Sequence, residues 1–185
     1  MSAAPEPEPH WLDEREQAAW RAFLEMHGRL LSQLNREMQD ATGLSNADFA
    51  VLVQLSEHPD ARMRVLELAR ALRWEKSRLS HQLTRMQRRG LLSRSNCSAD
   101  RRGAFVVLSE AGRAAVRRAA PAHVASVRSY VFDGLSPTEL DSWTAVSQHV
   151  LDRLDEIGDC PTDSETGCAS ADDVDNGRDT IRSGD

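Results

Sequence analysis

Apolar residues recur at helical spacing along most of the chain, and the first such stretch predicts a long helix. It runs from about Asp13 to Ala41, with Asp13 and Glu16 as a capping box and Gly43 closing it. The residues of this stripe recur at helical spacing and are Trp20, Phe23, Leu24, His27, Leu30, Leu31, Leu34 and Met38. A helix of roughly thirty residues spans ~45 Å, which is too long for a core of this size to cover alone. Part of this stripe is therefore expected to contact a partner subunit.

The next stretch predicts three short helices separated by tight turns. Ser45 with Asp48 opens the first helix, and His58-Pro59 ends it. The other two helices cover about 65–72 and 75–89.

The third of these helices has two distinct faces. Leu79, Leu83 and Met86 follow the spacing i, i+4, i+7 and form its predicted buried stripe. A separate face with nothing to bury carries Arg78, His81, Gln82, Arg85 and Arg89. An arginine can bind guanine O6 and N7, and a glutamine can bind adenine N6 and N7. This face is therefore expected to contact base edges or phosphates.

After this helix the pattern changes to that of two short strands. They are predicted at Leu91–Asn96 and Ala104–Ser109. Between them lies a hairpin tip, residues 97–103, which ends in glycine and carries Arg101 and Arg102. Helix, tight turn, helix and basic-tipped hairpin form the layout of a winged helix-turn-helix. In that layout the second helix enters the major groove, and the tip reaches the flanking backbone or minor groove.

Two further helices are predicted before the chain becomes polar. One runs from about Glu110 to Phe132 and contains Pro121, which is expected to kink or split it. The last begins at Ser136-Pro137, a strong start signal, and keeps apolar residues at helical spacing to about Ile157.

Charge is distributed unevenly along the chain. The net charge of −6 arises from 23 Lys and Arg against 29 Asp and Glu. Residues 159–185 carry eight acids and two bases and account for the whole net charge. This tail and the Pro- and Glu-rich residues 1–10 are predicted to be disordered. Residues 62–118 hold fifteen bases, fourteen of them Arg, against four acids. Such an excess favours binding to nucleic acid over an ordinary charged surface, which usually mixes signs.

Several function classes find no support in the sequence. No apolar run approaches the length of a membrane span, and the start MSAAPEPEPH lacks the layout of a signal peptide, so a soluble, cytoplasmic protein is expected. The three cysteines are too few and too scattered for a disulfide framework. The six histidines form no metal-binding motif, and no nucleophile elbow, phosphate-binding glycine loop or carboxylate pair is present. We therefore expect no enzyme activity, no metal and no cofactor.

Three segments of the basic region share their residue pattern with a known family. They are residues 79–92 (LSHQLTRMQRRGLL), residues 100–103 (DRRG) and residues 107–112 (VLSEAG). An Asp-x-Arg pattern and a later Leu-Ser-x-x-Gly pattern fall on Asp100, Arg102, Leu108, Ser109 and Gly112. These segments resemble the MarR family of bacterial transcriptional regulators, and with the order of the helices the resemblance covers about residues 11–157.

The resemblance implies a mainly α fold with a small β-wing: a winged helix-turn-helix DNA-binding domain plus N- and C-terminal helices that form a dimerisation domain. Residues 11–158 would then form one unit, with dimerisation helices at about 11–42 and 110–157 and a DNA-binding lobe at about 45–109. The resemblance also implies a homodimer on a pseudo-palindromic operator, usually as a repressor. Small aromatic or phenolic effectors often bind such regulators between the dimer helices and the lobe.

The candidate site residues combine the predicted helix face with the hairpin tip. The candidate DNA contacts are Ser77, Arg78, Ser80, His81, Gln82, Arg85, Arg101 and Arg102. By the resemblance, Asp100 orients Arg102 through an ion pair. Trp20 and His27 are candidates for lining an effector cavity, although a buried helix face requires the same spacing.

Two other functions are left open by the sequence. A winged-helix module could act through protein–protein contacts without DNA, although the excess of positive charge argues against this. Cys97 could make the protein redox-responsive, because Arg94 and Arg101 would favour its thiolate. An inert thiol is the alternative, since no second cysteine lies nearby.

Overall fold

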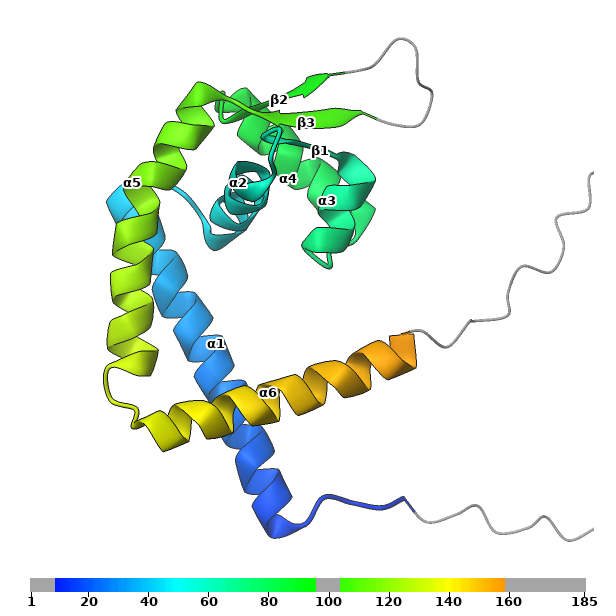
Figure 1. Cartoon of the computed structure of the whole chain (residues 1–185), viewed down its shortest axis with the longest axis vertical. Helices are drawn as coiled ribbons and strands as arrows, with labels where there is room; N and C mark the ends of the chain where they lie inside the picture. Colours follow the sequence, from blue (N-terminus) through cyan, green and yellow to red (C-terminus); the bar gives the residue numbers. More distant parts are fainter. Residues whose placement is uncertain (1–8, 96–103, 159–185) are drawn as a thin grey trace, which may run out of the picture. The chain divides into compact units, whose positions relative to one another are not determined.

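A computed structural model describes residues 9–95 and 104–158 of the 185-residue chain, which divides into two compact units, 1–135 and 136–185. The first unit contains most of the secondary structure (Figure 1). Its elements are α1 (Glu14–Thr42), α2 (Asn46–Glu57), β1 (Arg62–Arg64), α3 (Val65–Ala71), α4 (Lys76–Arg88), β2 (Leu92–Ser95), β3 (Phe105–Leu108), α5 (Glu110–Val127) and the π-helical segment η1 (Arg128–Phe132). The second unit contains α6 (Pro137–Gly158). The mainly α fold with a small sheet that the sequence predicts is confirmed.

Side-chain caps start the helices where the sequence predicts them. At α1, Asp13 Oδ1 accepts from the backbone N–H of Glu16, and Glu16 Oε2 accepts from that of Asp13, both at 2.8 Å. Ser45 and Asp48 form the same reciprocal pair at α2. At the other end of α1, Gly43 adopts φ 69°, a left-handed conformation that glycine tolerates without strain.

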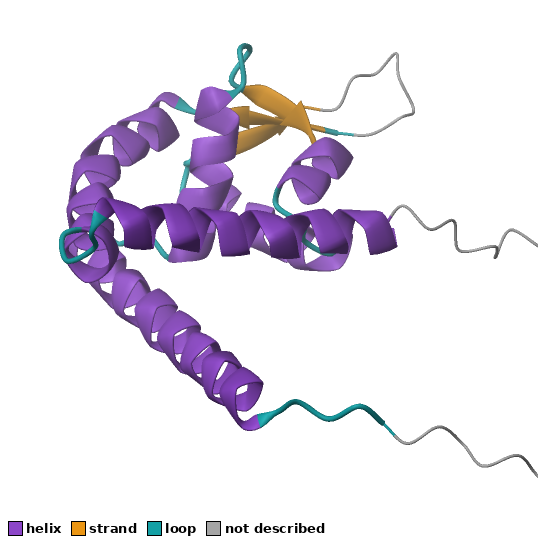
Figure 2. Cartoon of the chain, turned by 60° about the horizontal axis from the view of Figure 1, so that its bottom comes forward, coloured by secondary structure: helices purple, strands orange, loops and turns teal. Residues whose placement is uncertain are grey.

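The sheet has one strand more than the sequence predicts. Its order is β1–β3–β2, and β3 pairs antiparallel with both neighbours (Figure 2). The prediction of only two strands is wrong because β1 has three residues, too few for an alternating pattern to be recognised. Strand β1 connects α2 to α3 and thereby places the short α3 against the sheet.

Pro121 is expected from the sequence to kink or split its helix, and the structure contradicts the split. Helix α5 continues through Pro121 to Val127, and the next turn, η1, widens to a π-helix. Proline removes one backbone donor and crowds the preceding turn, but a helix packed along its length can absorb that cost. Helices α1 and α2 both pack against α5.

A core of aliphatic side chains holds α2, α3, α4 and the sheet together. Its fully buried members, at 0% exposure, include Val51, Leu52, Leu55, Leu68, Leu79, Leu83, Met86 and Val106. Three of these come from α4 and are the stripe that helical spacing predicts. The opposite side of α4 is consequently directed away from the core.

Gly112, in the first turn of α5, has no room for a side chain. A Cβ at this position would lie 2.1 Å from the carbonyl oxygen of Leu91, which accepts the backbone hydrogen bond of Ser109. We expect Gly112→Ala to lower the free energy of unfolding by about 1–3 kcal/mol, the usual cost of overpacking. Gly28→Ala is the matched control, because nothing lies within 4 Å of its Cβ and alanine favours a helix. Equal denaturant midpoints for the two variants would contradict this account.

Candidate nucleic-acid interface

The exposed side of α4 carries most of the predicted DNA contacts. Ser77, Arg78, Ser80, His81 and Arg85 are all exposed. Their exposure follows from the register of the helix, because Leu79, Leu83 and Met86 hold the other side in the core. The structure therefore leaves these five side chains accessible to a ligand, as the sequence predicts.

Gln82 does not belong to this exposed group, and the prediction that it is available to read a base is wrong for this structure. Its side chain is only 3% exposed, and its Nε2 donates to Asp48 Oδ1 on α2 at 2.7 Å. Helix α2 packs across the flank of α4 that carries Gln82. The amide is thus occupied inside the lobe.

Arg89 is likewise engaged within the protein rather than pointing freely outward. Its Nη1 donates to Asp48 Oδ2 at 2.7 Å, and its Nη2 donates to the carbonyl oxygen of Gly43 at 2.8 Å. Asp48 is 4% exposed, so Arg89 supplies the charge that a buried carboxylate requires. The sequence shows Asp48 only as a helix cap and gives no sign of this second role.

Two more arginines are fixed against neighbouring groups of the lobe. The Arg78 guanidinium lies over the Trp74 ring, 4.5 Å from its centroid, which restricts the side chain while leaving it exposed. Arg94 on β2 donates to the carbonyl oxygen of Ser80 at 2.9 Å and so ties the sheet to α4. The sequence does not mark Arg94 as a structural residue, because a lone arginine in a strand carries no distinguishing pattern.

The other candidates from the sequence belong to the hairpin between β2 and β3. Asp100, Arg101, Arg102 and Cys97 all lie outside the described residues. The strands that lead to them are present, with Ser95 of β2 paired to Phe105 of β3. The guanidinium of Arg62 on β1 lies 5.3 Å from the centroid of that Phe105 ring, so a further cation stands at this edge of the sheet.

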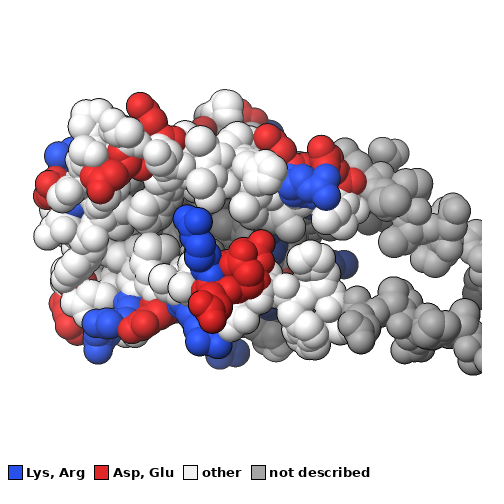
Figure 3. All heavy atoms as spheres, turned by 90° about the horizontal axis from the view of Figure 1, so that it is seen from below, with Lys and Arg blue, Asp and Glu red and all other residues white. Residues whose placement is uncertain are grey.

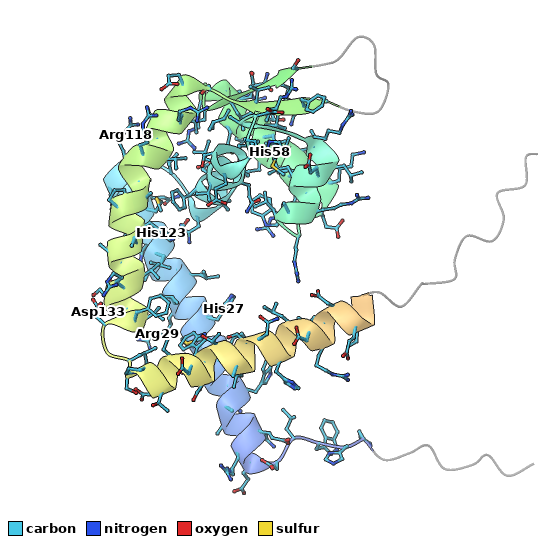
Figure 4. The ribbon with its side chains drawn as sticks, in the orientation of Figure 1. His27, Arg29, His58, Arg118, His123 and Asp133 are labelled. Carbon is cyan, nitrogen blue, oxygen red and sulfur yellow. The ribbon has the colours of Figure 1, made fainter. Side chains whose placement is uncertain are left out.

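Trp20 and His27 are absent from the lining of the two cavities described in the next paragraph. Trp20 is 52% exposed and stacks on Phe23, which in turn stacks on His27, at centroid distances of 5.6 and 5.9 Å. Figure 4 places His27 on α1, well before the turn of α1 that faces His123 of α5. The role of Trp20 and His27 in an effector cavity therefore stays a prediction.

One cavity lies between the last turns of α1 and the C-terminal third of α5 and has a volume of about 470 Å³. Its lining residues are Leu34, Glu37, Met38, Asp40, Ala41, Thr42, Ala122, His123 and Ser126. A second, of about 550 Å³, lies beside Arg29, Arg36 and Tyr130. Both fall within the size range of small-molecule sites in proteins.

Hydrogen bonds and burial determine the charge states in the first cavity. The hydrogen bond from Ser126 Oγ, at 2.5 Å, and those from Tyr130 and Gln33 lower the pKa of Glu37, which favours its ionised form. Burial lowers the pKa of His123, whose ring lies 4.9 Å from that of Phe49. At neutral pH the cavity therefore presents a carboxylate and a neutral imidazole.

A membrane span and a metal site are both absent from the described parts of the chain. No helix in these parts combines the length and apolar character that a membrane span needs. Nor do three His, Cys, Asp or Glu side chains come together there as metal ligands would.

Comparison with known proteins points to one family. The family model described as MarR matches residues 44–103. AbsC, a MarR family transcriptional regulator from Streptomyces coelicolor, is 43% identical, with 80% of this chain and 99% of AbsC covered at a TM-score of 0.75. Sco3205 from the same organism, a MarR family regulator solved in complex with DNA, is 37% identical, with coverages of 80% and 93% and a TM-score of 0.76. Transcriptional repressor MprA of Escherichia coli is 26% identical over 137 residues, 74% of this chain and 77% of MprA.

The lowered pKa of His123 predicts a pH dependence of stability. In the unfolded chain an imidazole takes up its proton near pH 6.5, whereas folded His123 does so only at a lower pH. The stability associated with neutral His123 is therefore present above pH 6.5 and decreases as the pH falls below it. We expect His123→Gln to lose less unfolding free energy between pH 7.5 and 5 than the wild type does.

Denaturant titrations at several pH values measure this difference. His149→Gln, at an exposed position of α6, controls for the removal of an imidazole and should retain the wild-type loss. Parallel curves for the wild type and His123→Gln would show that burial of His123 has no such effect.

Proposed function

The chain belongs to the MarR family of transcriptional regulators, and on that premise we propose that it is a cytoplasmic, sequence-specific repressor that binds a pseudo-palindromic operator as a homodimer. The observation that carries this proposal is the two-sided helix α4. One side is held in the core by three fully buried apolar residues, and the other exposes Ser77, Arg78, Ser80, His81 and Arg85. A helix of this kind fits the major groove of a DNA duplex.

Within this proposal, the side chains of α4 and the wing have different tasks. Arg85, Arg78 and His81 read base edges or bind phosphates from the major groove. Arg101 and Arg102 contact the backbone or minor groove beside it, with Asp100 orienting Arg102. The relatives support a DNA-binding role, since Sco3205 was solved with DNA and MprA is a repressor.

Exposed apolar side chains support the homodimer. Helix α1 and the segment before it expose Trp11, Leu12, Trp20, Phe23, Leu24 and Leu31. Helix α6 exposes Leu140, Trp143, Val146, Val150, Leu151, Leu154 and Ile157. Figure 3 shows a largely uncharged surface, with acidic and basic residues in small groups. Apolar surface on this scale usually marks an interface with another chain.

We place the effector site in the cavity between α1 and α5. Its volume is in the range of small-molecule sites, and its lining combines apolar side chains with polar groups, among them Glu37 and His123, that could orient a ligand. BpsR of Bordetella bronchiseptica, which shares the fold at 23% identity, is a protein whose DNA binding is regulated by 6-hydroxynicotinic acid. Thr42, the last residue of α1 in the cavity lining, directly precedes Gly43, so a bound molecule would contact the turn that holds Arg89.

Selection from a random duplex library tests sequence recognition, and two variants should then fail in different ways. Arg85→Ala should weaken binding to the selected sequence about 5- to 150-fold, the equivalent of about 1–3 kcal/mol for a lost base contact, and leave random DNA nearly unaffected. Arg102→Ala should weaken both and reduce the slope of log affinity against log salt by about one, the value for one phosphate contact.

Arg117→Ala is the matched control, because Arg117 on α5 is paired with Glu110 at 3.0 Å and has no proposed contact with DNA. If no sequence emerged from the library, or if both variants bound like the control, the proposed function would be wrong.

Sedimentation equilibrium tests the proposed homodimer. We expect the wild type to sediment at twice the mass of the chain, and Val146→Glu, at a 66% exposed position of α6, to shift it toward the monomer because the charge would be buried in the interface. Leu66→Glu introduces the same charge at a 53% exposed position of α3 and should remain dimeric. A monomeric wild type at micromolar concentration would refute the proposed assembly.

A further inference from the structure

Asp48 combines two features that seldom occur together in one side chain. It caps the start of α2, where its Oδ2 accepts from both the backbone N–H and the Oγ of Ser45 at 2.9 Å. It is also only 4% exposed and bound to α4 through Gln82 and to the end of that helix through Arg89. Burial of a carboxylate is costly unless charge and hydrogen bonds compensate it.

Capping alone does not explain why Asp48 is buried. Other reciprocal caps among the described residues, such as Asp13 with Glu16 and Ser136 with Glu139, have exposed carboxylates. Those caps start their helices without removing a carboxylate from water. The burial of Asp48 must therefore be related to what it binds on α4.

The carboxylate determines which way the Gln82 amide points. A carboxylate only accepts hydrogen bonds, so the NH₂ end of Gln82 must face Asp48, and the Oε1 end must face away. Oε1 in turn accepts from Nη2 of Arg85, three residues further along α4. The chain of bonds runs from the buried carboxylate to an exposed guanidinium.

One bond to Gln82 restricts the Arg85 side chain and leaves its other donors available. A guanidinium has five N–H groups, and a base edge such as that of guanine uses two of them. Restricting the side chain before DNA arrives reduces the entropy lost on binding. Arg89 completes the arrangement, since it neutralises Asp48 and joins α4 to Gly43 at the end of α1.

We infer that Asp48 and Gln82 are positioning residues for Arg85: they direct its guanidinium toward one base pair of each half-site, and Gln82 itself makes no base contact. This inference rests on the proposed function, because it requires α4 to read DNA. It assigns part of the sequence preference to a residue on α2 that is buried away from the duplex.

Asp48→Asn tests the inference with almost no change in shape. Oδ2 accepts three hydrogen bonds, so the single side-chain oxygen of the introduced asparagine is expected to occupy that position and its NH₂ to face Gln82. Gln82 must then turn its amide over, which presents NH₂ rather than oxygen to Arg85. The acceptor that holds Arg85 is lost, although every side chain keeps its volume.

The measurement is the base preference of each variant at every operator position, taken from binding selections on the sequence that the wild type selects. Asp48→Asn should reduce the preference at the position that Arg85→Ala affects, by about fivefold or more, and at no other. Asp48→Asn combined with Arg85→Ala should show no further loss at that position, because the first change acts through the second residue. Adding Gln82→Glu to Asp48→Asn places a carboxylate at position 82, which can accept from the NH₂ introduced at position 48 and from the Arg85 guanidinium. This double variant should recover most of the preference.

Val51→Ala controls for lost stability, because it removes two methyl groups from a fully buried position of the same helix. It should lower Tm but change the base preference by no more than about twofold, which is well below the effect of losing one base contact. A wild-type preference profile in Asp48→Asn would overturn the inference, as would loss of preference at a different base pair in Gln82→Met. A wild type without any sequence preference would instead refute the proposed function and this inference with it.

Discussion

The arrangement of the DNA-binding lobe depends on a carboxylate that has been removed from water. Asp48 accepts from Gln82 of α4, from Arg89 at the end of that helix and from its own helix start at Ser45. Leaving a buried charge without its partner typically costs about 3–5 kcal/mol, somewhat less here because the Arg89 side chain is 42% exposed. That cost favours one placement of α4 against α2 over a sliding or rotated one.

This constraint links the part of the molecule that would dimerise with the part that would read DNA. Arg89 binds both Asp48 and the carbonyl oxygen of Gly43, where α1 ends in a left-handed turn. The residues just before that turn line the cavity against α5. A ligand that displaced the last turn of α1 would thus act on the same bonds that orient α4. Regulation by a small molecule then requires only a shift between two arrangements of one cluster.

Local signals in the sequence predicted much of the fold. The caps at Asp13, Ser45 and Ser136, the glycine at position 43 and the stripe of Leu79, Leu83 and Met86 are all where the sequence placed them. Each depends on residues within about one or two helical turns, so one sequence suffices to recognise it. Strand β1 and the uninterrupted α5 could not be predicted, because pairing with β3 and packing against α1 and α2 determine them.

The sequence predicted the polar face of α4 but not the contacts that the side chains on this face make within the protein. Helical spacing put Gln82 and Arg89 beside Arg85, but it could not show that α2 packs over their side of α4. Such a neighbour, 34 residues away in sequence for Asp48 and Gln82, leaves no trace in the local pattern. The role of Asp48 was missed for the same reason, since its cap already explained it.

A crystal structure of the protein bound to its selected operator would test the central claim most directly. The account predicts that the Gln82 amide still bonds to Asp48 in the complex while the Arg85 guanidinium donates to a base edge in the major groove. A complex in which Gln82 has left Asp48 to contact a base, with Arg85 on a phosphate, would contradict it.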